Sequence, residues 1–209
     1  MRRDEDRLAV LRTFIAVELN DEVRHQVDAV QARMRAVVPP GSVRWVAVAN
    51  MHVTLKFLGD TRPDQLHRIV EVLKAVGQTQ EPFAVTVAGR GCFPNFRRPN
   101  VVWAGLHDRG ERLAHLADAI EQAVAPLSWP PDDRGFRPHL TLGRVNQRVD
   151  SRQRSELGRA IEALEVGTLG TIEVHRFHFI QSDLRPDGPQ YTVLARIPLG
   201  TAEPGALSE

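Results

Sequence analysis

Two histidines, each followed two positions later by a threonine, are the residues of this chain best suited to chemistry. Residues 52–55 have the sequence HVTL and residues 139–142 have the sequence HLTL, so one His-x-Thr-Leu pattern occurs twice, 87 positions apart. Both copies lie in apolar, β-branched surroundings that are typical of strands. Because alternate side chains of a strand share a face, the histidine and the threonine of each copy are expected to point the same way.

Imidazole accepts and donates protons near neutral pH, since its unperturbed pKa is about 6.5. Two imidazoles on opposite sides of a phosphorus atom can act as a neutral general base and a charged general acid, each contributing about 10²–10⁴ in rate. Threonine hydroxyls on the same face can donate hydrogen bonds to the non-bridging oxygens. The repetition therefore predicts one shared catalytic site that contains His52, His139, Thr54 and Thr141.

Each histidine taken alone has a plainer interpretation, as a packed or surface residue, and threonine is common in strands. A zinc site is a further interpretation, but the pattern lacks a third ligand nearby and matches no usual zinc spacing. Cys92 is the single cysteine, which excludes an internal disulfide and a cysteine-based metal cluster. We therefore expect a site without a metal ion or a cofactor.

Arginines close to the second pattern are weaker candidates. Arg137 precedes His139 by two positions, so strand parity places its guanidinium on the same face, where it can hold a phosphate. The alternative is a solvated loop arginine. Arg144 has the opposite parity and reaches that face only if the strand bulges or ends at Gly143.

Three further residues are candidates for contacting a nucleotide, together with Arg144. Lys56 has the parity of His52 and can contribute positive charge, unless it is an ordinary exposed strand lysine. Phe96 and Arg97 belong to an FRRP stretch that is expected to form an exposed loop, where an aromatic ring and a cation can contact a base.

The composition of the chain excludes several broad classes of protein. Of its 209 residues 42% are hydrophobic and 25% charged, as in a globular domain, and the net charge of +1 gives no global attraction to nucleic acid or membrane. No apolar stretch is long enough for a membrane span or a signal peptide, so we expect a cytoplasmic protein without a membrane partner. No heptad pattern or long apolar edge indicates an obligate assembly, and a monomer is expected.

Strand-like and helix-like segments alternate around the two patterns. Apolar stripes at helical spacing predict helices at 21–37, 63–76, 109–125 and 151–164. Strands are expected at 12–19, 43–48, 82–88, 100–105 and 190–197, at the two patterns, and near 170–181. Short gaps between the early strands argue against a doubly wound parallel sheet. The predicted fold class is α+β and bilobal: two pseudo-symmetric lobes, each a mostly antiparallel sheet with outer helices, around a central cleft.

The segments HVTLKFLG at 52–59 and RPHLTLGR at 137–144 resemble the paired signatures of the 2H phosphoesterase superfamily. More narrowly, they resemble the bacterial and archaeal RNA 2′,3′-cyclic phosphodiesterases, historically called 2′-5′ RNA ligases. The similarity extends to 12–19, 43–46, 93–105 and 181–191. We expect an N-terminal extension over 1–11, a single bilobal domain over 12–198 and a flexible tail over 199–209.

The resemblance implies metal-independent hydrolysis of RNA 2′,3′-cyclic phosphate ends to 2′-phosphomonoesters. It makes His139 the base that activates water, His52 the acid that protonates the 3′-oxygen, and Thr54 and Thr141 the phosphate ligands. The nearly symmetric patterns do not by themselves separate base from acid. The implied partners are RNA termini, including tRNA fragments, or small cyclic nucleotides. Two alternatives stay open: a 2′-5′ RNA ligase that runs the same chemistry in reverse, and a non-catalytic module that binds RNA ends or nucleotides.

Overall fold

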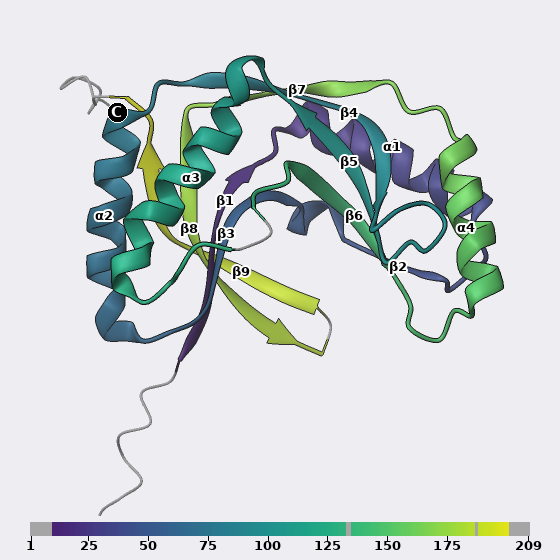
Figure 1. Ribbon diagram of the computed structural model, residues 1–209, viewed down its shortest axis with the longest axis horizontal. Coiled ribbons are helices and arrows are strands. Elements are labelled where there is room, and N and C mark those ends of the chain that lie inside the picture. The colour runs from purple at the N-terminus through teal and green to yellow at the C-terminus, as the bar shows by residue number, and fades with distance from the viewer. Residues whose placement is uncertain (1–9, 133–134, 187, 201–209) are drawn as a thin grey trace, which may run out of the picture.

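Two antiparallel sheets and their covering helices make up the protein (Figure 1). The computed structural model describes residues 10–132, 135–186 and 188–200, and in these ranges the chain forms nine strands and four α-helices. The strands are β1 (Leu11–Glu18), β2 (Val43–Trp45), β3 (His52–Thr61), β4 (Phe83–Phe93), β5 (Val101–His107), β6 (His139–Val145), β7 (Thr168–Val174), β8 (Arg176–Arg185) and β9 (Gly188–Pro198). The α-helices are α1 (Asp21–Val37), α2 (Leu66–Thr79), α3 (Arg112–Val124) and α4 (Ser151–Ala163).

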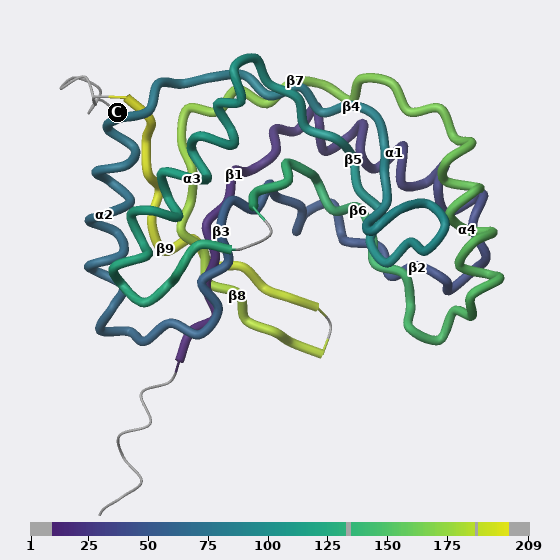
Figure 2. The backbone as a smooth tube through the Cα atoms, viewed as in Figure 1, coloured from purple at the N-terminus to yellow at the C-terminus, as the bar shows by residue number. Residues whose placement is uncertain are grey.

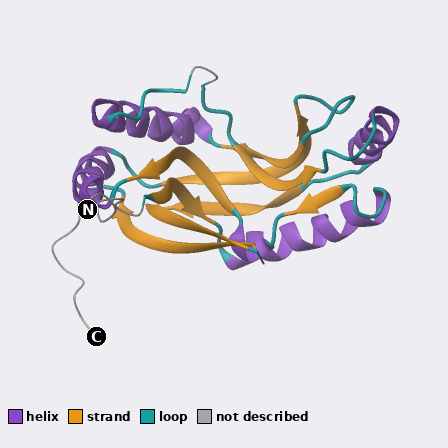
Figure 3. Cartoon of the chain, turned by 90° about the horizontal axis from the view of Figure 1, so that it is seen from below, coloured by secondary structure: helices purple, strands orange, loops and turns teal. Residues whose placement is uncertain are grey.

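Each sheet carries its own pair of helices. The four-stranded sheet has the order β3-β1-β8-β9, and α2 and α3 pack on it through β9 and β3. The five-stranded sheet has the order β2-β6-β5-β4-β7, and α1 and α4 pack on it through β7 and β4. Figure 3 shows the strands in the middle of the molecule and the helices around them. The predicted α+β, bilobal fold class is confirmed.

The two lobes do not correspond to the two halves of the sequence. β2 belongs to the five-stranded sheet although β1 and β3, on either side of it in sequence, pair in the other sheet. The region near 170–181 forms two strands that separate at His175, and β7 and β8 lie in different sheets (Figure 2). Each sheet therefore contains strands from both halves of the sequence, and the chain connections between the sheets hold the two lobes together.

Amphipathic patterning accounts for the helices. Val23, Val27, Val30 and Met34 of α1 are buried, as their spacing predicts, whereas Val37, the last residue of the same stripe, is 44% exposed. Asn20 caps this helix: its side-chain oxygen accepts a hydrogen bond from the backbone N–H of Val23 at 2.9 Å. None of the helices in the described part of the chain has the length and apolar character needed to cross a membrane.

β4 is longer than the sequence predicted, because a bulge lets the strand continue past residue 88. Its pairing with β5 shifts between Ala88 and Gly91, and Gly89 has a φ of +69°, a conformation that glycine adopts without strain. Gly91 also lacks the side chain that would collide with the ring of Trp103, since an added Cβ would lie 2.1 Å from it. The extension carries Phe93 to the start of β6.

The predicted chain-terminal segments lie mostly outside the described residues. Of the expected N-terminal extension over 1–11, residues 1–9 are not described, and of the expected tail over 199–209, residues 201–209 are not described. The domain boundaries remain predictions.

Candidate active site

The two histidines occupy equivalent positions in the two sheets. His52 is the first residue of β3 and His139 is the first residue of β6. β3 and β6 belong to different sheets, yet they contact one another, so the histidines lie on both sides of the junction between the lobes. Each sheet thus supplies one histidine, and the shared catalytic site that the sequence indicated remains a prediction.

Both imidazoles are held in the same tautomer. Nδ1 of His52 lies 3.1 Å from the backbone carbonyl of Asn50, and Nδ1 of His139 lies 2.7 Å from that of Arg137. A carbonyl oxygen only accepts hydrogen bonds, so both Nδ1 atoms must donate a proton. Nε2 of each neutral ring therefore keeps the lone pair, and this nitrogen is the one able to exchange protons with a ligand.

Aromatic rings surround the first histidine. Phe14 of β1 stacks on the His52 ring at a centroid distance of 4.5 Å, and Tyr191 of β9 meets it edge-on at 5.3 Å. Burial lowers the pKa of His52 to about 4, against the opposing effect of its hydrogen bond to Asn50, and the charge of Arg24 lowers it further. His52 is thus neutral at pH 7 in the free protein.

The second histidine has a related but less enclosed setting. Phe93 meets the His139 ring edge-on at 4.9 Å. Burial again lowers the pKa below its usual value, the carbonyl of Arg137 opposes this shift, and the positive charge of Arg144 adds to it. The expectation of one neutral and one charged imidazole at neutral pH does not describe the free protein, in which burial favours the neutral form of both.

A β-bulge in the first pattern changes which residues face the site. Ala16 of β1 lies opposite Thr54, whereas Ile15 lies opposite Lys56, so Leu55 is an extra residue in β3. Opposed residues of an antiparallel pair share a face. Thr54 therefore lies on the face of His52, as predicted, and Lys56 lies on the other face.

The parity prediction for Lys56 is wrong, and its side chain has a structural partner. The Lys56 side chain is 8% exposed and points toward α3, where its Nζ lies 2.5 Å from Oε2 of Glu121 and 2.8 Å from the carbonyl of Pro130. With both contacts directed into the lobe, Lys56 is not available to a nucleotide at the histidines.

The same bulge occurs in the second pattern and has the opposite consequence. Trp103 of β5 lies opposite Thr141, and Val102 lies opposite Gly143, so Leu142 is the extra residue. The bulge turns Arg144 onto the face of Thr141 and His139. A bulge in this strand is one of the two conditions under which the sequence analysis expected Arg144 to reach the face of His139.

Arg144 connects the surroundings of the two histidines. Its positive charge helps to lower the pKa of His139. The pKa of Tyr191 is raised by burial, and the charges of Arg12 and Arg144 oppose part of that rise. The Tyr191 ring in turn contacts His52. The charge of Arg144, in one lobe, thus acts on Tyr191, which belongs to the other lobe.

The remaining candidates have mixed placements. Arg137 is exposed and contributes its backbone carbonyl to His139, and no hydrogen bond or ion pair of its guanidinium with a described residue is found. Phe96 is half-buried and packs against the core, and its carbonyl lies where a side chain on Gly158 of α4 would be. It is not the free loop aromatic that the sequence predicted. Arg97 is exposed beside it.

Sequence reasoning missed the aromatic residues at the site. Phe14 lies in the strand expected over 12–19 and Tyr191 in that expected over 190–197, and neither was singled out as a site residue. Tyr191 is the single tyrosine of the chain, which is the one signal that marks it. It lines a cavity of about 650 Å³ together with His52, Glu18 and Arg24. Among the described residues, no three His, Cys, Asp or Glu side chains are grouped as a metal site requires.

Solved structures share this fold, and curated proteins are similar to this chain in sequence. The crystal structure of TT0787 of Thermus thermophilus matches with a TM-score of 0.75 and 28% identity, over 92% of this chain and all of that one. E. coli LigT, solved in complex with 3′-AMP, matches with a TM-score of 0.72 and 26% identity, over 92% of this chain and 99% of LigT. Two curated proteins named RNA 2′,3′-cyclic phosphodiesterase also match. The protein from Archaeoglobus fulgidus is 35% identical over 87% of this chain and 96% of its own length, and that from Methanothermobacter thermautotrophicus is 33% identical over 87% and 95%.

These matches define a class of phosphoesterases that share this α+β fold. The model of the family described as LigT like phosphoesterase matches the chain twice, over residues 17–103 and 106–191, and each match contains one of the two histidine patterns. The chain therefore belongs to the LigT-like phosphoesterase family. The resemblance to the 2H superfamily that the sequence motifs indicated is confirmed.

Proposed function

We propose that this protein hydrolyses RNA 2′,3′-cyclic phosphate ends to 2′-phosphomonoesters without a metal ion. The observation that supports this proposal best is the matched setting of the two histidines: each Nδ1 donates to the carbonyl two residues earlier, and each Nε2 is left to exchange protons. The names of the curated relatives point to the same substrate.

In the proposed reaction a water molecule attacks the phosphorus atom of the cyclic ester. Nε2 of His139 takes a proton from the water while the new P–O bond forms, and the bond from phosphorus to the 3′-oxygen breaks. Nε2 of protonated His52 gives its proton to the departing 3′-oxygen. The hydroxyls of Thr54 and Thr141 donate hydrogen bonds to the non-bridging oxygens, where charge accumulates.

The unequal burial of the histidines favours this division of roles. Burial lowers the pKa of His52 to about 4, so its protonated ring is a strong proton donor. His139 is less enclosed, and in the neutral form that burial favours, its Nε2 lone pair can accept a proton. Arg144 of β6, and Arg137 two residues before the start of that strand, would supply positive charge to the phosphate.

The bound phosphate itself helps to charge the acid. At pH 7 a group with a pKa near 4 is protonated in only about one molecule in 10³. An anionic phosphodiester next to the ring stabilises the imidazolium and raises its pKa. Substrate binding would therefore produce the protonated His52 that the reaction requires.

A cyclic-phosphate oligonucleotide incubated with the protein in excess chelator tests the proposal, with the product followed by phosphorus NMR. We expect a 2′-phosphomonoester, and a loss of at least about 10² in rate for His52→Ala and for His139→Ala separately. His67→Ala, on the exposed side of α2, is the matched control and should keep full activity. Activity that disappears with chelator and returns with a divalent cation, or that survives both substitutions, refutes the proposal.

A further inference from the structure

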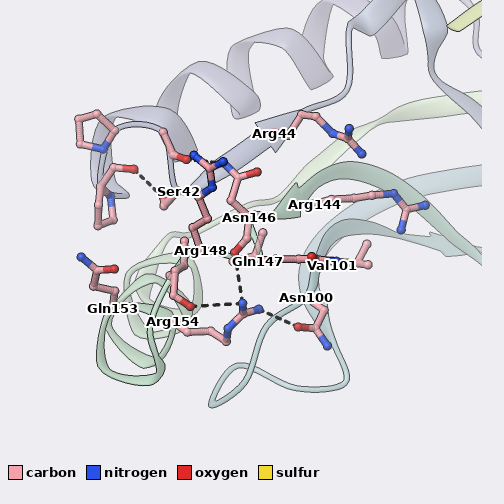
Figure 4. A pocket seen from close by; sticks show the side chains of 15 residues that line it. Ser42, Arg44, Asn100, Val101, Arg144, Asn146, Gln147, Arg148, Gln153 and Arg154 are labelled. Atoms are coloured by element: carbon pink, nitrogen blue, oxygen red, sulfur yellow. Dashed lines mark hydrogen bonds between the residues drawn. The ribbon is translucent and has the colours of Figure 1, made fainter. Parts of the chain in front are cut away.

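A cavity rich in arginine lies at the far end of the second histidine strand (Figure 4). Its volume is about 1000 Å³, and residues from β2, β6, the loop after β6 and the start of α4 line it. Four arginines, Arg44, Arg144, Arg148 and Arg154, are among the lining residues, which include no aspartate or glutamate. Since the whole chain has a net charge of only +1, this is a local concentration of positive charge.

The four arginines divide into one that holds the cavity together and three that are open to a ligand. Arg154 donates to the carbonyl of Pro99 and the side chain of Asn100, each at 2.7 Å, and to the carbonyl of Asn146 at 3.2 Å. Arg44, Arg144 and Arg148 are exposed, and none of them makes a hydrogen bond or an ion pair with a residue that the structure describes.

The register of the strands joins this cavity to the proposed active site. Arg44 of β2 lies directly opposite Arg144 of β6, so the two side chains share a face, and Figure 4 shows them extending to the same side. That face also carries Thr141 and His139. His139 and Arg144 are five residues apart on one strand, which at about 3.3 Å a residue is roughly 16 Å. Arg144 thus lies both on the face of the proposed phosphate ligand Thr141 and in the wall of the basic cavity.

We infer that this cavity binds the phosphodiester backbone of single-stranded RNA upstream of the cyclic end, a conclusion that rests on the proposed function. A cyclic mononucleotide carries one phosphate and would engage only the histidine site. An oligonucleotide carries further phosphates, and Arg44 and Arg148 offer planar guanidinium groups suited to phosphate oxygens. The cavity makes the protein selective for RNA ends over free cyclic nucleotides.

The double variant Arg44→Ala/Arg148→Ala tests the inference with two substrates, 2′,3′-cyclic AMP and an oligonucleotide of about ten nucleotides with a 2′,3′-cyclic end. We expect the ratio of kcat/KM for the oligonucleotide to that for the mononucleotide to fall about tenfold. The slope of log kcat/KM against log salt for the oligonucleotide should flatten by about 1.4, since each lost contact to a single strand contributes about 0.7. Arg68→Ala/Arg109→Ala, which removes the same charge from exposed residues outside the cavity, is the control.

Binding of a fluorescent oligonucleotide with a 2′-phosphate end, measured by anisotropy, separates this inference from the proposed function. A tenfold weaker affinity in the cavity variant, with the control unchanged, supports the cavity even if the wild-type protein hydrolyses neither substrate. An unchanged ratio and unchanged affinity overturn the inference. Equal losses toward both substrates also overturn it, because they would place these arginines in the active site or in the folding of the lobe.

Discussion

At the scale of single residues, the two histidines make the same backbone hydrogen bond but differ in how far their rings are buried. Each is fixed by a backbone carbonyl two residues earlier, so the tautomer follows from the strand itself. The difference arises from the neighbours: His52 has Phe14 stacked on it and Tyr191 at its edge, whereas His139 has Phe93 at its edge. A sequence pattern that is almost symmetric is therefore made asymmetric by residues distant in sequence.

The pKa of His52 should respond to an anion in the site. In the free protein we expect a pKa of about 4, and a nucleotide 2′-phosphate at saturation should raise it by about one unit or more, because the anion stabilises the charged ring. Titration of the His52 Hε1 resonance by proton NMR, with and without the nucleotide, measures both values. The His52 signal is assigned by its loss in His52→Gln. A pKa that stays at its free value on binding would mean that the phosphate does not approach this ring.

At the scale of elements, one bulge repeated in two strands determines which side chains the site receives. After each His-x-Thr the extra leucine, Leu55 or Leu142, reverses the alternation. The reversal withdraws Lys56 into the first lobe and turns Arg144 toward the site of the second. Strand parity alone cannot anticipate this, because a bulge leaves no reliable mark in the residues that form it.

Lys56 should therefore act on stability and not on substrate binding. Lys56→Met leaves the carboxylate of Glu121, which is only 16% exposed, without its partner, and we expect unfolding to become easier by about 3 kcal/mol. Urea denaturation measures this loss, and kcat/KM of the folded variant should stay near the wild-type value. The double variant Lys56→Met/Glu121→Leu should regain most of the stability. A Lys56→Met protein of normal stability and poor activity would return Lys56 to the site.

The sequence predicted the positions of helices and strands better than it predicted the side of a strand or loop on which each side chain lies. The helical spacing over 21–37 is a local feature, and it predicted α1 correctly. Phe96 was misjudged because its polar, arginine-rich neighbours indicate a loop, whereas its burial depends on α4, about sixty positions away, approaching through Gly158. Contacts of this kind are set by tertiary packing, which propensity does not contain.

At the scale of the whole molecule, the chain crosses between lobes more than once, and the proposed site depends on that crossing. β2 enters the five-stranded sheet between two strands of the other, and β8 and β9 return to the first sheet after β7. The return brings Tyr191 to His52. The surroundings of each histidine therefore include an aromatic residue from the other half of the sequence: Tyr191 for His52 and Phe93 for His139.

Burial of three histidines makes the stability of the fold sensitive to acid. The pKa values of His52, His139 and His178 are all lowered in the folded protein, chiefly by burial. Below their ordinary pKa of about 6.5, the unfolded chain binds protons that the folded chain does not. Stability should therefore fall as the pH decreases from about 6.5, and for His52 the fall should continue to about pH 4. Above pH 7 these groups are neutral in both states and should contribute no slope.

The contribution of His52 can be isolated by substitution. A pKa that drops from about 6.5 to about 4 on folding corresponds to roughly 3 kcal/mol lost over that interval. Urea denaturation of the wild type and of His52→Gln at several pH values between 4 and 8 gives the two stability curves. They should differ by a constant above pH 7 and converge or cross as the pH falls, because glutamine binds no proton. Curves that remain parallel down to pH 4 would show that folding leaves the proton affinity of His52 unchanged, and the enclosure of its ring by Phe14 and Tyr191 would then have no electrostatic consequence.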